Sequence, residues 1–185
     1  RSLLKSFIKS RRYFSLLFLF ITFEKNKFPQ MEKIDSLNQV AEFHRTFNAP
    51  ILENPQLPSA ERCNLRIALL QEELNELKQA IEDQDIVEIA DALCDLQYVL
   101  SGAVLEFGLG EKFVDLFNEV QRSNMSKACD TEEQAQETVE FYTSRGEDAY
   151  YEMSGDKYNV HRVSDNKVLK NKYYSSANLK SILEK

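Results

Sequence analysis

The chain has 185 residues, of which 43% are hydrophobic, which suits one folded domain with a small appendage. Five glycines and four prolines give few turn signals and favour long helices over many short strands. The net charge of −7 divides into +6 for residues 1–30 and −13 for residues 31–185, so the acidic body excludes nucleic-acid binding through a broad basic face and would bind a polyphosphate only through bridging cations.

The first thirty residues differ from the rest, because basic residues precede the apolar run 13–23 as in a signal peptide. The run is short for a transmembrane helix, and no small-residue cleavage site follows it. We interpret residues 1–30 as a non-native or leader extension outside the working fold. Export or membrane tethering is the minor alternative, and no membrane association is expected of the mature core.

The cysteines indicate the compartment. Cys63, Cys94 and Cys129 match no zinc-binding spacing, and a sparse, odd number argues against a disulfide framework. We therefore expect a reducing, cytoplasmic location. Cys94 falls within an apolar helical pattern and is expected to be a small core residue.

Apolar residues at helical spacing predict four helices in the first two thirds of the chain, over residues 32–47, 60–82, 86–107 and 111–123. Three prolines indicate an extended loop between the first two helices, and Ser59 is a suitable N-cap for the second. Gly108 and Gly110 mark the end of the third. These residues make up a predicted helical core, 31–128.

The pattern changes after residue 128. Asp130 and Glu133 have the spacing of a capping box that begins a short helix to about residue 144. Alternating runs at 149–153 and 157–163 predict a β-hairpin. We therefore expect an all-α, antiparallel helical bundle with a helix and small C-terminal β-hairpin as an insertion, 129–163. A polar loop over 164–174 and a last helix over 177–184 complete the chain, within residues 164–185.

Carboxylates on two consecutive helices fall where apolar residues are expected. At 100° per residue, Glu73 points into the middle of the apolar arc of the helix 60–82, and Glu76 lies at its edge. The helix 86–107 is apolar almost all round except for one acidic stripe, formed by Glu88, Asp91 and Asp95. An ionised carboxylate buried there is costly unless it is paired or binds a metal.

A short connection predicts that these two helices pack as an antiparallel hairpin with their acids facing each other. Oxygen ligands without His or Cys suit Mg²⁺ or Mn²⁺ and not zinc. We therefore predict a metal site on Glu73, Glu76, Glu88 and Asp91.

Each acid also has a simpler interpretation. Glu88 could close a capping box with Asp85, and Glu72 lies nearer the polar side, where it is solvated or paired with basic groups. Glu73 and Glu76, taken alone, would fit a partly exposed helix edge. Their combination with acids on the next helix favours the metal site.

Glu72-Glu73-x-x-Glu76 followed by Glu88-x-x-Asp91 resembles the E-x-x-E…E-x-x-D signature of the all-α NTP pyrophosphatases, which include MazG-like proteins, dimeric dUTPases and phosphoribosyl-ATP pyrophosphohydrolases. Further segments resemble the phosphoribosyl-ATP pyrophosphohydrolase-like branch: Phe43-His44-x-x-Phe47, residues 90–99, Ser123-Asn124-Met125-Ser126-Lys127 and Lys167-Val168-Leu169-Lys170. The resemblance covers about residues 34–128 and 164–184. The eleven-residue gap between the acid pairs is short for MazG-like members, so which of Glu88, Asp91 and Asp95 bind metal directly is left open.

The resemblance implies a fold of the all-α NTP pyrophosphatase type and hydrolysis of a nucleoside triphosphate to the monophosphate and pyrophosphate. It implies that residues 31–128 are the catalytic core and that residues 164–185 complete the site. Glu72 or Asp95 would position or deprotonate the attacking water. The candidate substrate-binding residues are Asn124, Lys127, Lys170, Tyr173 and His44. Without the resemblance, the lysines would be solvated loop residues and His44 a structural or surface histidine.

Helices that are apolar on most sides need further cover, so we expect a homodimer or homotetramer. Three alternatives stay open. The chain could be a non-catalytic helical oligomer that binds nucleotide or a protein partner, a phosphoribosyl-ATP pyrophosphohydrolase of histidine synthesis, or a membrane-tethered helical protein.

Overall fold

The computed structural model of the chain describes residues 31–184. All the helices and strands that it describes lie between Ser36 and Leu183. The interpretation of residues 1–30 as a leader or extension therefore falls outside the described residues.

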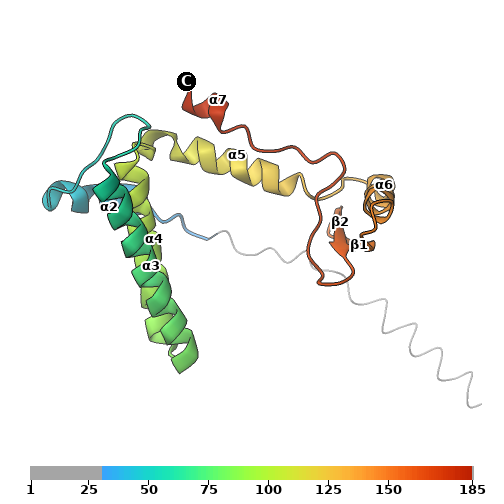
Figure 1. Cartoon of the computed structure of the whole chain (residues 1–185), viewed down its shortest axis with the longest axis horizontal. Coiled ribbons are helices and arrows are strands. Elements are labelled where there is room, and N and C mark those ends of the chain that lie inside the picture. Colours follow the sequence, from blue (N-terminus) through green and yellow to red (C-terminus); the bar gives the residue numbers. More distant parts are fainter. Residues whose placement is uncertain (1–30, 185) are drawn as a thin grey trace, which may run out of the picture. The chain divides into compact units, whose positions relative to one another are not determined.

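The described residues form six α-helices, one 3-10 turn and a two-stranded antiparallel sheet (Figure 1). In chain order they are α2 (Ser36–Thr46), α3 (Ala60–Asp83), α4 (Ile86–Glu106), the 3-10 turn η1 (Gly110–Lys112), α5 (Phe113–Met125), α6 (Glu132–Thr143), β1 (Ala149–Ser154), β2 (Lys157–Arg162) and α7 (Lys180–Leu183). The prediction of an all-α fold with a small C-terminal β-hairpin is confirmed.

The helices α3 and α4 form the predicted hairpin and pack side by side (Figure 1). Ser59 caps α3, because its side chain accepts a hydrogen bond from the N–H of Arg62 at 3.3 Å. Gln84 adopts a left-handed φ of 57° and ends α3, and Asp85 caps α4 by accepting from the N–H of Glu88 at 3.3 Å. The two helices are therefore joined by two residues, which places their acid-bearing segments next to each other.

The opposite end of this hairpin is fixed by α2 and by the proline-containing loop. Val40 of α2 is buried with Leu105 of α4 in one of the two hydrophobic clusters. The N–H of Leu52 donates to the carbonyl of Leu105 at 3.0 Å, which ties the loop to the end of α4. Gly108 follows with a φ of 68°, and a Cβ there would lie 2.0 Å from the carbonyl oxygen of Asn54. Only glycine fits this close approach.

A second hydrophobic cluster holds the C-terminal elements together. Leu169 is buried in it, and its N–H donates to the carbonyl of Val160 in β2 at 2.8 Å. The expectation of a plain polar loop over 164–174 was therefore incomplete, because this segment pairs with β2 and supplies a core residue. The buried members of the cluster are Cys129, Ala135, Val160 and Leu169.

The start of α6 corrects one predicted cap. We expected Asp130 and Glu133 to form a capping box, but Thr131 has the extended backbone of an N-cap, and its hydroxyl accepts from the N–H of Gln134 at 3.2 Å. The side-chain oxygen of Gln134 in turn accepts from the N–H of Asp130 at 3.0 Å. The cap is therefore shifted by one residue.

Over residues 31–184, no single helix is long and apolar enough to cross a membrane. The pair formed by Ile86–Glu106 and Gly110–Met125 passes on length and composition only when its two parts are taken together, and it bends by 113°.

Candidate active site

The predicted acids lie along the α3–α4 hairpin and influence one another. Partial burial raises the pKa of Glu73, and the charge of Asp95 on α4 raises it further, followed by those of Glu76, Glu72 and Asp91. Five of the six predicted acids thus lie near enough to one another, across the two helices, for the charges of four to raise the pKa of the fifth, Glu73. Glu88, nearest the connection between the helices, is not among the described groups that shift this pKa.

These acids lack an internal counter-charge. Within residues 31–184, none of the six carboxylates accepts a hydrogen bond or forms an ion pair. Glu73 and Asp95 are partly buried, and the other four are exposed. We call these six residues the acid face: Glu72, Glu73, Glu76, Glu88, Asp91 and Asp95.

The donor set of the acid face fits a hard divalent cation, because all its ligands are carboxylate oxygens that no other group occupies. The geometry within one chain is more open than a finished site. Across the described residues, no group of three or more His, Cys, Asp or Glu side chains stands close enough to hold an ion. The ligand chemistry therefore agrees with the sequence prediction, and the assignment of individual ligands stays a prediction.

The expected burial of α4 on most sides is wrong for the chain taken alone. Ile86 is 74% exposed and Leu93 is 51% exposed, and Cys94, expected in the core, is exposed as well. The reason is that the described elements packed on α4 are chiefly α3 and α2, and the α2 contacts lie toward its C-terminal half. The acids of α4 are consequently more exposed than we expected from the apolar residues around them in the sequence.

The N-terminal cap of α4 bears on the role of Glu88. The carboxylate of Asp85 accepts from the N–H groups of Val87 and Glu88, at 2.9 and 3.3 Å. A complete capping box would also need the Glu88 side chain to accept from the N–H of Asp85, which instead donates to the carbonyl of Ala80 at 3.0 Å. The capping interpretation thus accounts for Asp85 and leaves the Glu88 carboxylate without a partner.

At the opposite end of the hairpin, charged side chains are buried and paired. Glu106 is only 1% exposed and accepts hydrogen bonds from the guanidinium groups of Arg62 and Arg66. Burial alone would raise the pKa of Glu106, but the hydrogen bonds from the two arginines outweigh it and lower that pKa. We call His44, Arg62, Arg66, Gly102 and Glu106 the buried arginine cluster.

His44 belongs to this cluster and is 2% exposed. Its Nδ1 lies 2.8 Å from the carbonyl oxygen of Pro50 and must donate to it, so Nε2 accepts from Arg66 Nη2 at 3.2 Å. Both ring nitrogens are therefore engaged, which agrees with the structural alternative for His44. Its role in substrate binding stays a prediction. Sequence reasoning missed Arg62, Arg66 and Glu106, because their partners lie about forty residues away.

The candidate phosphate-binding residues form a group of their own. Lys127 Nζ donates to Asn124 Oδ1 at 2.9 Å, and Lys170 Nζ lies 4.3 Å from the ring centre of Tyr174. The phenol of Tyr174 shares a hydrogen bond with Ser123 at 2.9 Å, which lowers its pKa, and the charges of Lys170 and Lys127 lower it further. The structure thus brings the two lysines together around Tyr174, a residue that sequence reasoning passed over.

Tyr173, the tyrosine chosen from the sequence, has another partner. Its phenol donates to Glu137 of α6 at 2.6 Å, and Lys172 donates to the same carboxylate at 3.2 Å. The two hydrogen bonds lower the pKa of Glu137, that from Tyr173 more strongly. Among residues 31–184, no hydrogen bond or ion pair joins Tyr173, Asn124, Lys127 or Lys170 to the acid face.

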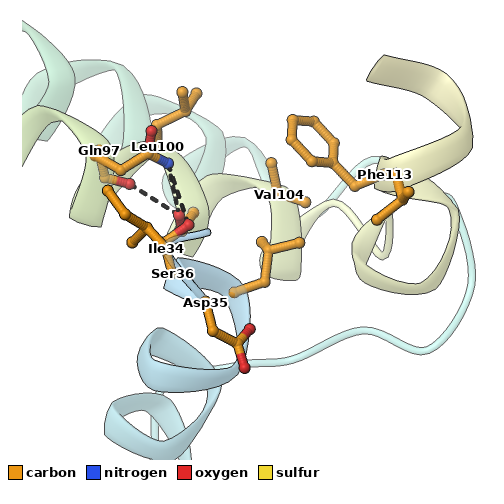
Figure 2. A pocket seen from close by; sticks show the side chains of 10 residues that line it. Ile34, Asp35, Ser36, Gln97, Leu100, Val104 and Phe113 are labelled. Atoms are coloured by element: carbon orange, nitrogen blue, oxygen red, sulfur yellow. Dashed lines mark hydrogen bonds between the residues drawn. The ribbon is translucent and has the colours of Figure 1, made fainter. Parts of the chain in front are cut away.

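A pocket of about 180 Å³ lies beside the N-terminus of α2 (Figure 2). Gln97 donates to Ser36 at 3.4 Å and to Ser101 at 3.1 Å within it, and Val104 and Phe113 supply apolar walls. Gln97 follows Asp95 by two residues, or about 200° of helix rotation. The pocket therefore lies on the side of α4 away from the acid face.

The sequence comparisons identify the helical core. Residues 40–124 match the phosphoribosyl-ATP pyrophosphohydrolase family. An uncharacterized protein of Acanthamoeba polyphaga mimivirus is 25% identical over 253 aligned positions, which cover 85% of this chain and 99% of the viral protein.

Residues 40–124 are thus a domain of the phosphoribosyl-ATP pyrophosphohydrolase family, which belongs to the MazG-like NTP pyrophosphatase superfamily. The matched range contains α3, α4 and the whole acid face. The domain is that of a pyrophosphohydrolase, an enzyme that hydrolyses phosphoric anhydrides.

Proposed function

We propose that the chain is a Mg²⁺- or Mn²⁺-dependent nucleoside triphosphate pyrophosphohydrolase that releases a nucleoside monophosphate and pyrophosphate. The acid face carries this proposal, because six carboxylates gather on two packed helices with no internal cation among the described residues. Like charges gathered on neighbouring helices repel one another and destabilise the metal-free chain. A bound cation would offset that repulsion, which is why the acid face supports a metal site.

Glu73, Glu76, Glu88 and Asp91 are the proposed metal ligands. These residues would hold a divalent cation, which would supply positive charge to neutralise and orient the phosphates. The charges of Asp95, Glu76, Glu72 and Asp91 all raise the pKa of Glu73, so we assign Glu73 the central position in the ligand set.

The chain's own groups would carry out the remaining steps. Glu72 or Asp95 accepts a proton from the attacking water and orients it. Asp95 is partly buried, whereas Glu72 is exposed, so Asp95 is the more sheltered of these two candidates. Among the neighbouring acids, the charge of Asp95 also raises the pKa of Glu73 most. Lys127 and Lys170 bind phosphate oxygens as point charges, and Asn124 exchanges its bond with Lys127 for one with the sugar or base.

We also propose that the active form is a homodimer or homotetramer in the cytoplasm. Exposed apolar side chains on α3 and α4, including Leu74, Ile81, Ile86 and Leu93, support the first part. Three free cysteines at 63, 94 and 129 support the second.

Phosphoribosyl-ATP is the second candidate substrate, and the family match favours it. It has the same α,β-anhydride as a nucleoside triphosphate, so the acid face would serve either reaction. The additional C-terminal unit around Leu169 and Val160 lies outside the matched range, which is why we rank this substrate below nucleoside triphosphates.

The test is a substrate panel with the full-length chain and Mg²⁺ or Mn²⁺. The panel contains the common ribo- and deoxyribonucleoside triphosphates, modified and oxidised triphosphates, and phosphoribosyl-ATP, with chromatographic detection of monophosphate and pyrophosphate. We expect equal amounts of the two products and no reaction in excess chelator. Release of orthophosphate, or no turnover of any substrate, would contradict the proposal. Thermal stabilisation by nucleotide without turnover would instead indicate a non-catalytic binding protein.

A further inference from the structure

The buried arginine cluster has no part in the proposed chemistry, yet it occupies the same helix interface as the acid face. We propose that it is a positioning device, which sets the rotation and register of α3 against α4 and so fixes which carboxylates of the two helices face each other across the acid face. This inference rests on the proposed function, and its test separates the two.

The first argument is helical geometry. Arg66 precedes Glu73 by seven residues, so the two lie within about 20° on the same side of α3 and about 10 Å apart along its axis. Glu106 follows Asp95 by eleven residues, again within about 20° and about 16 Å along α4. A rotation of either helix that separated Arg66 from Glu106 would therefore also turn Glu73 away from Asp95.

The second argument is steric. A Cβ built on Gly102 would lie 2.6 Å from Nη1 of Arg66 and 3.1 Å from Nε2 of His44. The guanidinium of Arg66 therefore lies directly against the backbone of α4, one turn before Glu106. Rotating α4 so that a larger side chain faced Arg66 would displace the guanidinium, so this contact favours one relative rotation of the helices.

The third argument is anchoring. His44 lies on α2 and accepts a hydrogen bond from Arg66 of α3. Its other ring nitrogen donates to the carbonyl of Pro50 in the loop that follows α2. The N–H of Leu52 reaches the end of α4 at the carbonyl of Leu105. Three segments thus converge on this end of the hairpin. Among the described residues, no hydrogen bond or ion pair holds the carboxylates of the acid face in the same way.

A purely stabilising role explains the cluster less well. Arg66 and the half-buried Arg62 share one carboxylate that is 1% exposed, and Nε of Arg66 is buried without a hydrogen-bond partner among the described residues. Buried ion clusters of this type are often no more stabilising than apolar residues of similar volume. Fixing one geometry is a function that apolar residues would not replace.

The test measures Mn²⁺ affinity of the full-length chain by calorimetry, at a temperature where circular dichroism shows each variant to be folded. The first variant, Gly102→Ala, pushes a methyl group against Arg66 without removing any charge. The second, Arg66→Met with Glu106→Met, replaces the buried pair with apolar side chains of similar length. Glu119→Gln is the matched control, because it removes an Arg–Glu pair on α5.

We expect each folded test variant to bind Mn²⁺ at least about tenfold more weakly, in the range seen when groups that orient metal ligands are removed. The Mn²⁺ concentration for half-maximal pyrophosphate release should rise in parallel, with turnover partly restored at saturating Mn²⁺. The control should stay within about twofold of the wild type.

The outcomes are distinct. If the wild type binds Mn²⁺ and the folded variants bind it equally well, the cluster is only structural and the inference is overturned. If the wild type binds no Mn²⁺ and hydrolyses no substrate, the proposed function itself fails, and the inference fails with it. The Met pair keeps the test decisive if Gly102→Ala does not fold, since it introduces no steric overlap.

Discussion

The two ends of the α3–α4 hairpin treat charge in opposite ways. At one end, Glu106 is buried and two arginines neutralise it. At the other, the six residues of the acid face stand on partly or fully exposed positions without an internal cation among the described residues. The carboxylate that the arginines neutralise is buried, whereas the unpaired carboxylates lie where solvent, or the cation proposed above, can reach them.

The largest expected effect is on activity at the acid face. Glu73→Gln and Asp91→Asn remove the charge of a proposed ligand and keep its shape, so pyrophosphate release should fall by about 100-fold or more. Glu82→Gln is the control, because Glu82 also lies on α3 but pairs only with Lys78 at the surface. Its activity should match the wild type within about twofold in a steady-state assay.

The same substitutions should affect stability in the reverse direction. Removing one of several repelling carboxylates should raise the melting temperature of the metal-free chain, while abolishing the further rise that Mn²⁺ gives the wild type. A metal-free Glu73→Gln chain that melts below the wild type would show that these acids do not repel one another as described.

The paired end should respond to loss of charge as a stability defect. Glu106→Gln leaves Arg66 buried beside a neutral partner, which should cost about 3 kcal/mol of unfolding free energy in a urea titration. Glu119→Gln on α5 should have a much smaller effect, because that pair is more exposed. Equal shifts in the two urea midpoints would show that burial does not make loss of the Glu106 charge more destabilising than loss of the Glu119 charge.

The pH dependence should have opposite signs at the two ends. The pKa of Glu106 is lowered on folding, so its contribution is present above the ordinary pKa of glutamate and is lost as the pH falls through the lowered value. The pKa of Glu73 is raised, so folding is favoured as the pH falls through that raised value toward the ordinary one. Carboxyl carbon shifts in NMR, followed against pH, should show Glu73 titrating above Glu106. The reverse order would rule out this electrostatic description.

Glu119 provides a third titration, away from both ends of the hairpin. Hydrogen bonds from Arg122 and then from the N–H of Asn178 lower its pKa to about 2. The attachment of the C-terminal segment to α5 should therefore weaken only as the pH falls from about 4.5 toward 2. Amide exchange at Asn178 measures this, and early loss of protection near neutral pH would contradict it.

The smallest effect is expected at the connection between α3 and α4. Asp85→Ala removes the acceptor for two N–H groups of α4 and should reduce stability by about 1 kcal/mol. Ser59→Ala at the start of α3 is the matched control for loss of a cap. Because Asp85 is exposed and adjoins the acid face, a change in Mn²⁺ affinity larger than the change in stability would show that the cap also orients Glu88.

Local signals predicted most of the fold. The hairpin α3–α4 followed from apolar periodicity and from the caps Ser59 and Asp85, which act within three residues. The β-hairpin was marked by the turn at Gly155, whose φ is positive, and by the alternation on either side. The acid face was predicted because Glu88, Asp91 and Asp95 share one stripe of α4 and Glu73 falls in the apolar arc of α3, which sequence alone defines.

The remaining features depend on packing between distant segments. The bonds from Arg62 and Arg66 to Glu106 join residues 44 and 40 positions apart, and sequence spacing contains no sign of them. The hydrogen bond between Tyr174 and Ser123, which lie 51 positions apart, depends on how the last loop folds back on α5. Cys94 is exposed in the chain taken alone, because the described elements packed on α4 are chiefly α3 and α2.

The most direct test of the central claim is a calorimetric titration of the metal-free, full-length chain with Mn²⁺, alone and with a nucleoside triphosphate. The acid face predicts saturable binding that is lost in Asp91→Asn and kept in Glu82→Gln. No uptake of Mn²⁺ by the wild type under either condition, or equal uptake by Asp91→Asn, would contradict the assignment of these carboxylates as a metal site.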